Sequence, residues 1–267
     1  SKVQHHLTKL TKNRLLQQQT HPYKGYRLTT AGYDTLALNS HVKTNTLEAI
    51  GKPLGVGKEA DVHEALTPTK QQVAIKFHRL GRPSFRQTKR KRDYAQSKYA
   101  PNWHQQSTVA AKKEYKALKL LEPHNTAAPK PIRQNRHTLI MTLINGAPLN
   151  LYPEIPHPQK VLREILNNIK EAYQKAGIIH SDLSPYNILI QPNLHILIID
   201  WPQYVSTNHP NAQQLLKRDV KNVLDFFKQK ERLEMTLKQA LEYVKGDWTL
   251  FTTSDVQTNI QDVVPTN

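Results

Sequence analysis

Apolar residues recur along this chain at two spacings, one typical of helices and one typical of strands. Near the N-terminus, Val3, Leu7, Leu10 and Leu15 lie at roughly helical spacing, which predicts a helix over residues 2–19. Residues 22–28 then predict a small β-turn element. A second helix is expected to follow, with Thr29 or Thr30 as its N-terminal cap.

The order helix, short β element, helix is typical of the end of a winged helix. Two helices and one β element bury too little apolar surface to fold alone, so we expect earlier helices to precede residue 1. If residues 2–19 form a recognition helix, Lys9, Lys12 and Arg14 are candidates for phosphate contact. A solvated basic helix face explains the same residues equally well.

The middle of the chain alternates between short apolar runs and longer helical patterns. Residues 62–66 and 72–77 predict two strands, and residues 138–144 predict a buried strand. Residues 107–121 and 158–176 carry the helical period.

Two short apolar runs, residues 188–190 and 196–199, follow the second of these helices. A turn around Pro192-Asn193 separates them, which predicts a hairpin. Helices are then expected over 212–228 and about 233–245. Residues 252–267 have no apolar period, so we expect a loose tail.

Composition narrows the class of protein. The 267 residues include no cysteine, which excludes disulfides and thiolate metal sites and fits a cytoplasmic protein. No apolar run approaches the length of a membrane span, and Ser1-Lys2-Val3 does not resemble the start of a signal peptide. We therefore expect no membrane partner.

The net charge of +17 indicates a polyanionic partner, most often nucleic acid. Much of this charge lies in residues 79–98, which have poor apolar periodicity and are interpreted as a mobile loop. The alternative is a merely solvated insert. The candidate nucleic-acid contacts are Arg86, Lys89, Arg90, Lys91 and Arg92.

Polar side chains stand at the ends of the predicted hairpin. His180, Asp182 and Asn187 come just before its first strand, and Asp200 comes just after its second. A hairpin brings these two ends together, so Asp182, Asn187 and Asp200 are expected to converge. Carboxylate and amide oxygens are hard ligands that suit Mg²⁺ or Mn²⁺, with the coordination completed by substrate phosphates.

The spacing His-x-Asp-x-x-x-x-Asn, with an aspartate after the next strand, matches the catalytic and metal loops of protein kinases. Val-Ala-Ile-Lys, ending at Lys76, matches the kinase strand whose lysine meets the α- and β-phosphates. Glu114, inside a predicted helix, is the candidate partner of that lysine. Ahead of Lys76 lies a glycine turn in which Ala60 replaces the third glycine of the usual kinase loop.

Five stretches together resemble the RIO kinases, atypical protein kinases that act in maturation of the small ribosomal subunit, and in particular their winged-helix branch. The resemblance covers residues 2–245, and the short C-terminus suggests an archaeal member. The stretches are Gly55-Val-Gly-Lys-Glu-Ala-Asp-Val62, Lys76-Phe-His-Arg-Leu-Gly-Arg82, Lys89-Arg-Lys-Arg-Asp-Tyr94, His180-Ser-Asp-Leu-Ser-Pro-Tyr-Asn187 and Ile199-Asp-Trp-Pro-Gln203.

The resemblance implies an α+β fold: a two-lobed, protein-kinase-like RIO fold preceded by a partial winged helix. The expected divisions are 1–45 for the winged-helix part, 46–144 for the N-lobe, 145–250 for the C-lobe and 251–267 for the tail.

The resemblance also implies a role for each site residue. Asp182 is the catalytic carboxylate, and Asn187 and Asp200 hold Mg²⁺. Asp200 is also the expected acceptor of the ATP γ-phosphate, and Lys76 binds phosphates. The phosphate loop and the adenine-facing hinge are expected to consist of Gly55, Val56, Gly57, Lys58 and Glu59, and of Met141, Thr142, Leu143 and Ile144.

Three functions remain open from the sequence. The first is an ATP-driven factor that binds the pre-small-subunit ribosomal particle and its RNA, acting as a monomer. The second is a conventional protein serine kinase, which the absence of an Ala-Pro-Glu activation segment disfavours. The third is a small-molecule phosphotransferase, which the basic charge disfavours. A non-enzymatic pseudokinase is a poor fit, because every phosphate-transfer position is filled.

Overall fold

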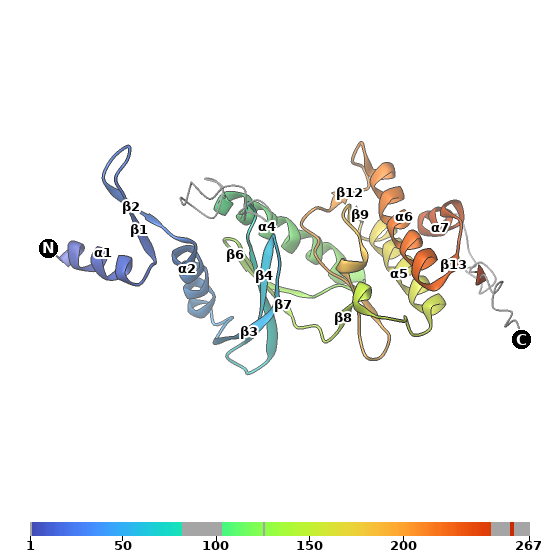
Figure 1. The fold of residues 1–267 in the computed structure, drawn as a ribbon, viewed down its shortest axis with the longest axis horizontal. Helices are drawn as coiled ribbons and strands as arrows, with labels where there is room; N and C mark the ends of the chain where they lie inside the picture. Colours follow the sequence, from blue (N-terminus) through green and yellow to red (C-terminus); the bar gives the residue numbers. More distant parts are fainter. Residues whose placement is uncertain (1, 82–102, 125, 247–256, 259–267) are drawn as a thin grey trace, which may run out of the picture. The chain divides into compact units, whose positions relative to one another are not determined.

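The computed structural model describes residues 2–81, 103–124, 126–246 and 257–258 (Figure 1). Its backbone divides into two units, which are treated separately below. The first unit comprises residues 1–112 and 132–141, and the second comprises 113–131 and 142–267. This division places the second half of the helix Trp103–Leu121 (α4) with the second unit.

The first unit begins with helix α1 (Lys2–Lys12), followed by strands β1 (Leu16–Gln19) and β2 (Gly25–Leu28). The prediction of one helix over residues 2–19 was therefore wrong beyond Lys12. Arg14 has a left-handed backbone (φ 58°), which ends the helical path, and Leu16–Gln19 instead pair antiparallel with Gly25–Leu28.

Helix α2 (Thr30–Lys43) follows, and the Thr29 side chain accepts a hydrogen bond from the Gly32 N–H at its start. This confirms one of the two predicted caps. The helix packs close to the turn before β1, since a Cβ on Gly32 would lie 2.3 Å from the Leu15 carbonyl oxygen. Only glycine fits there.

The rest of the first unit consists mainly of a five-stranded sheet, in the order β3-β4-β5-β7-β6, together with the first half of α4. Its strands are β3 (Ala49–Val56), β4 (Ala60–Leu66), β5 (Gln72–His78), β6 (Pro131–Asn135) and β7 (Thr138–Thr142). Val73, Ile75, Phe77 and Ile140 lie in its core, and Leu38 of α2 packs against them. Helix α2 therefore shares the core of the sheet.

The second unit is built around helix α5 (Pro158–Gln174), whose buried face includes Val161, Leu162, Ile165 and Leu166. The predicted hairpin is present as β10 (Ile188–Ile190) and β11 (Ile196–Ile198), and β8 (Ala147–Pro148) extends its sheet. Strands β9 (Ile178–Ile179) and β12 (Val205–Ser206) form a separate pair. Three short 3₁₀ turns lie at Glu122–His124, Leu149–Leu151 and Pro185–Asn187.

The second unit ends with helices α6 (Ala212–Glu231) and α7 (Leu237–Lys245). The last helix starts later than the predicted residue 233. Leu233–Glu234 form strand β13 instead, and Thr236 caps α7 through a capping box with Gln239. The tail prediction was wrong at one point: Gln257–Thr258 form strand β14, which pairs with β13. The remainder of the tail lies outside the described residues.

Candidate functional site

The hairpin in the second unit places three oxygen-bearing residues by main-chain pairing. Strands β10 and β11 pair Ile188 with Ile198 and Ile190 with Ile196. The ladder continues beyond the strands, because the Ile199 N–H donates to the Asn187 carbonyl oxygen at 2.9 Å. Asn187 therefore lies across from the residue just before Asp200, as the sequence predicted.

His180 links the stretch around Asp182 to the segment before Asp200. Its Nε2–H donates to the Ile199 carbonyl oxygen (3.0 Å), and its Nδ1 accepts from the Asp182 N–H (3.3 Å). Burial lowers the pKa of His180 below its usual value, although the Ile199 bond and nearby carboxylates, Glu114 among them, oppose the shift. The imidazole is therefore neutral, with the proton on Nε2.

The donor set at the hairpin end fits a hard divalent cation. Asn187 Nδ2 donates to the Asp182 carbonyl oxygen at 3.0 Å, so its amide nitrogen is used within the protein. Asp182 is exposed, and Asn187 and Asp200 are half-buried, which leaves their side chains accessible to a ligand. No cluster of three or more His, Cys, Asp or Glu side chains suited to a metal occurs among the described residues. Mg²⁺ takes few protein ligands and keeps water or phosphate oxygens, and the candidate ligands here are the Asn187 and Asp200 side chains.

A buried carboxylate that sequence reasoning did not assign to the site holds the loop around Asp182. Asp219 of α6 is 1% exposed and accepts the N–H groups of Ser181 (2.6 Å) and Leu183 (3.2 Å). Burial raises the pKa of this carboxyl to about 6, although those two bonds favour the ionised form. Asp219 therefore fixes the residue on each side of Asp182.

Two residues at the site have left-handed backbones, Ser181 (φ 63°) and Asp200 (φ 69°). This conformation is unfavourable for residues other than glycine, asparagine and aspartate. Ser181 is held in it from several sides: its Oγ donates to the Gln203 carbonyl oxygen at 2.5 Å, and its own carbonyl oxygen accepts from Arg218. The surrounding bonds determine this backbone path.

Trp201 directly follows Asp200, the candidate metal ligand. Its indole Nε1–H donates to the Ile198 carbonyl oxygen at 2.9 Å, and the centroid of its ring lies 4.6 Å from the centroid of the His180 ring. The side chain is 1% exposed. Both its packing and its hydrogen bond therefore fix the chain next to Asp200.

The first unit carries the predicted phosphate-binding residues. Lys76 lies in β5 and is 5% exposed, opposite Val62 of β4. The glycine loop is the turn between β3 and β4, closed by a bond from the Gly57 N–H to the Ala60 carbonyl oxygen at 2.8 Å. Gly55, Val56, Gly57, Lys58 and Glu59 are exposed, as a ligand-binding loop requires.

Glu114 and the hinge segment have definite local environments. Glu114 is 1% exposed, which contradicts the alternative that it is a surface residue. Met141 is buried at the end of β7. The Thr142 N–H donates to the Lys130 carbonyl oxygen (2.9 Å), so this donor is not available to adenine, and Leu143 and Ile144 follow it as half-buried residues.

The predicted nucleic-acid contacts Arg86, Lys89, Arg90, Lys91 and Arg92 lie outside the described residues. The beginning of the basic stretch, however, was misinterpreted. Arg79 is 6% exposed and ion-paired with Asp34 and Asp61, so it is a buried structural residue and not part of a solvated basic loop.

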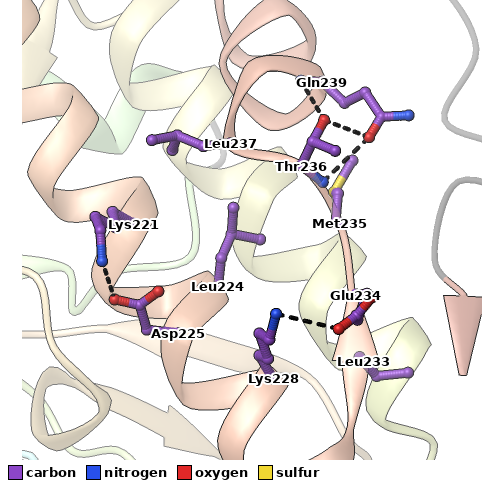
Figure 2. A pocket seen from close by; sticks show the side chains of 10 residues that line it. All are labelled: Lys221, Leu224, Asp225, Lys228, Leu233, Glu234, Met235, Thr236, Leu237 and Gln239. Atoms are coloured by element: carbon purple, nitrogen blue, oxygen red, sulfur yellow. Dashed lines mark hydrogen bonds and ion pairs between the residues drawn. The ribbon is translucent and has the colours of Figure 1, made fainter. Parts of the chain in front are cut away.

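A cavity of about 480 Å³ lies in the second unit between α6, β13 and the start of α7 (Figure 2). Its charged side chains pair with one another: Lys221 with Asp225, and Lys228 with Glu234. None of its lining residues is a predicted site residue.

Among the described residues, no helix combines the length and apolarity that crossing a bilayer requires.

Lys76 on its strand, the glycine turn and the β10–β11 hairpin with Asp182, Asn187 and Asp200 at its end together define a protein-kinase-like protein. The family model for the RIO domain matches residues 61–240, and a second one, described as Rio2, N-terminal, matches residues 1–44. The chain belongs to the RIO family, in its Rio2 branch. This confirms both the recognised family and the predicted fold class.

Similar proteins include kinases from eukaryotes and an archaeon. The serine/threonine-protein kinase rio2 of Schizosaccharomyces pombe is 38% identical over 222 residues, which are 83% of this chain and 64% of that protein. The RIO-type serine/threonine-protein kinase Rio2 of Methanocaldococcus jannaschii is 38% identical over 229 residues, 82% of this chain and 84% of that protein. The serine/threonine-protein kinase rio2 of Dictyostelium discoideum is also 38% identical, over 221 residues, and this chain spans only 42% of that protein's length.

Solved structures agree with this assignment. The Rio2 kinase of Chaetomium thermophilum, in its ADP/Mg²⁺-phosphoaspartate complex, has a TM-score of 0.78 and 34% sequence identity to this chain. The match covers 90% of this chain and 75% of that one. A second structure of the same kinase has a TM-score of 0.79.

Proposed function

We propose that this protein is a Mg²⁺-dependent ATP phosphotransferase that transfers the γ-phosphate of ATP to its own Asp200. In this reaction Asn187 and Asp200 hold Mg²⁺, which neutralises charge on the phosphates. Lys76 and the glycine loop bind the phosphate groups of ATP. Asp182, fixed by Asp219 and His180, orients the attacking group.

The proposed transfer forms one bond and breaks one. A carboxylate oxygen of Asp200 attacks the γ-phosphorus, the bond to the β-phosphate oxygen breaks, and ADP leaves with the electron pair. The product is an acyl phosphate on Asp200. Water then attacks this acyl phosphate and releases inorganic phosphate, which restores the carboxylate.

The position of Asp200 carries the proposal. It follows β11 with a left-handed backbone, while the carbonyl oxygen of the preceding Ile199 is bonded to His180 and its N–H to Asn187. A flexible acidic turn would not need two residues, His180 and Asn187, to fix the residue before it. The phosphoaspartate complex of the Chaetomium thermophilum kinase shows that a protein similar to this chain has an aspartyl phosphate state.

The test is a single-turnover reaction with γ-labelled ATP and Mg²⁺, followed by hydroxylamine. Hydroxylamine cleaves acyl phosphates and leaves phosphoserine intact, so a label lost on treatment supports phosphorylation of an aspartate. Asp200→Ala should abolish both the label and ATP turnover. A label that survives hydroxylamine and maps to serine would instead indicate the second candidate, a protein serine kinase, which the names of the relatives favour.

The matched control is Asp225→Asn, because Asp225 is a carboxylate of the same unit on the exposed part of α6 and pairs with Lys221. This variant should keep both the label and the turnover. Loss of the label in this control would show that the assay reports damage to folding.

We also propose that the physiological partner is the pre-small-subunit ribosomal particle with its RNA, in the cytoplasm. The support is the net charge of +17, which favours a polyanion, and the resemblance to RIO kinases. Neutralising Arg90, Lys91 and Arg92 together should weaken RNA binding and reduce its dependence on salt, since each lost phosphate contact lowers the salt slope by about one. An unchanged slope would show that this segment makes no phosphate contacts.

A further inference from the structure

Arg79 lies directly after β5, three residues beyond Lys76, and forms the centre of a buried polar cluster. We name this the Arg79 cluster; it consists of Asp34, Asp61, Arg79 and His137. The Arg79 guanidinium donates two bonds to Asp34, at 2.7 and 2.9 Å, and a third from Nε to Asp61 at 3.0 Å. It also lies over the Phe77 ring, 5.1 Å from its centroid.

On one side the cluster is attached to helix α2. Asp34 belongs to that helix and also accepts a bond from His137 Nε2 at 2.7 Å. Burial raises the pKa of Asp34, but the bonds from His137 and Arg79 outweigh this, so its pKa lies below the usual value and the group is ionised. Burial keeps the pKa of His137 low, so His137 donates as a neutral imidazole. A charged bidentate pair therefore joins Arg79 to α2.

On the other side the cluster is attached to the glycine loop. The Arg79 N–H donates to the Glu59 carbonyl oxygen at 2.6 Å, and its side chain holds Asp61, two residues further on. Between them, Ala60 accepts the Gly57 N–H that closes the loop. One arginine therefore fixes the C-terminal end of the loop from both its main chain and its side chain.

The other side of the loop continues from strand β3, which pairs with β4 and is exposed to solvent. All eight residues of β3 are exposed, and a Cβ on Gly55 would meet nothing within 4 Å. Because this side of the loop is exposed, the buried attachment of Glu59 and Asp61 to Arg79 contributes to the loop's average position.

We propose that Arg79 is a positioning residue for ATP binding. It holds the glycine loop in position through Glu59 and Asp61, and its ion pair with Asp34 makes helix α2 of the N-terminal domain part of the same support. The inference rests on the proposed function, because it assumes that the loop binds ATP. It follows that a change at α2 alters nucleotide affinity without touching the nucleotide. Thermodynamic linkage requires the reverse as well, so bound ATP must stabilise α2.

The first test uses Arg79→Lys, Asp34→Asn and the double variant. Lysine keeps the charge but cannot make the bidentate and Nε bonds together, and asparagine keeps the shape but loses the charge. Each single change should raise the Kd for Mg²⁺-ATP by about fivefold or more, a typical coupling between sites. The Kd of the double variant should not exceed that of the single variant that binds Mg²⁺-ATP less tightly, because both changes break the same connection.

The control is Lys70→Ala, which breaks the exposed Lys70–Glu48 ion pair of the same unit, where Nζ lies 2.5 Å from Glu48 Oε1. It should leave the Kd unchanged. A melting temperature that falls in the Arg79 and Asp34 variants while their Kd stays at the wild-type value would overturn the proposal and leave the cluster a purely structural role.

The second test needs no variant and therefore does not depend on folding of a mutant. Hydrogen exchange of the wild-type protein is measured with and without saturating Mg²⁺-ATP. Slower exchange of amides in both residues 55–61 and α2 supports the connection, whereas protection of the loop with unchanged exchange in α2 refutes it. Absence of ATP binding to the wild type would count against the proposed function, so the two failures are distinguishable.

Discussion

Replacement of Asp219 by asparagine tests how the loop around Asp182 is held. The carboxylate accepts two main-chain N–H groups, one on each of its oxygens. An asparagine side chain has a single acceptor oxygen, so one N–H must lose its partner and face an NH₂ group. An unsatisfied buried donor costs about 1–3 kcal/mol. ATP turnover should fall by about tenfold or more, because small displacements of catalytic groups are costly.

The pH dependence of the free energy of unfolding tests the state of Asp219 more directly than turnover does. The folded-state pKa of Asp219 is raised from 3.8 to about 6, so the proton binds more tightly in the folded protein. The resulting stability is fully present below pH 3.8 and is lost as the pH rises through about 6. From pH 5 to pH 8, this group should lower the wild-type free energy of unfolding by about 1.4 kcal/mol, whereas asparagine contributes no such change.

The assay is denaturant unfolding of wild type and Asp219→Asn at several pH values. The wild-type free energy of unfolding minus that of Asp219→Asn should be largest at the acidic pH values and should decrease toward pH 8. Asp225→Asn, an exposed change on the same helix, should show no such trend. A wild-type-minus-variant difference that is flat with pH would refute the raised pKa, and unchanged turnover would refute the positioning role.

Three further substitutions test local packing. Gly32→Ala should destabilise the first unit by about 2–3 kcal/mol in thermal unfolding, because its Cβ would lie 2.3 Å from the Leu15 carbonyl oxygen; a wild-type melting temperature would contradict that geometry. Gly55→Ala, which meets nothing within 4 Å, should leave stability within about 0.5 kcal/mol and weaken only Mg²⁺-ATP binding, as titration would show. Trp201→Phe should cost at least about 1 kcal/mol in chemical denaturation through loss of the bond to Ile198, and an unchanged midpoint would show that this bond contributes nothing.

The sequence predicted the β10–β11 hairpin well because its geometry is local. Two apolar triplets and a turn determine the register, and the register places Asn187 near Asp200. Helix α1 was predicted too long for an equally local reason. Leu15 fits the helical period, and periodicity carries no information about the left-handed backbone of Arg14.

Residues whose roles depend on distant partners were assigned less well. Asp219 lies 38 positions from Ser181, and Arg79 lies 45 positions from Asp34. One signal was present for Asp219: Leu216, Val220 and Val223 surround it on the buried face of α6, where an aspartate needs hydrogen-bond partners. No comparable pattern marks Arg79, which the sequence places at the start of a basic run.

The buried indole of Trp201 has a consequence for inhibitor design. In protein kinases, packing of the residue after the metal-loop aspartate distinguishes active from inactive arrangements. A compound that needs this side chain to leave its pocket must here break the Nε1–H bond to Ile198 and separate the indole from His180. Compounds that compete with the nucleotide and leave the metal loop in place avoid that cost. They are the better starting chemistry for selective probes of this protein.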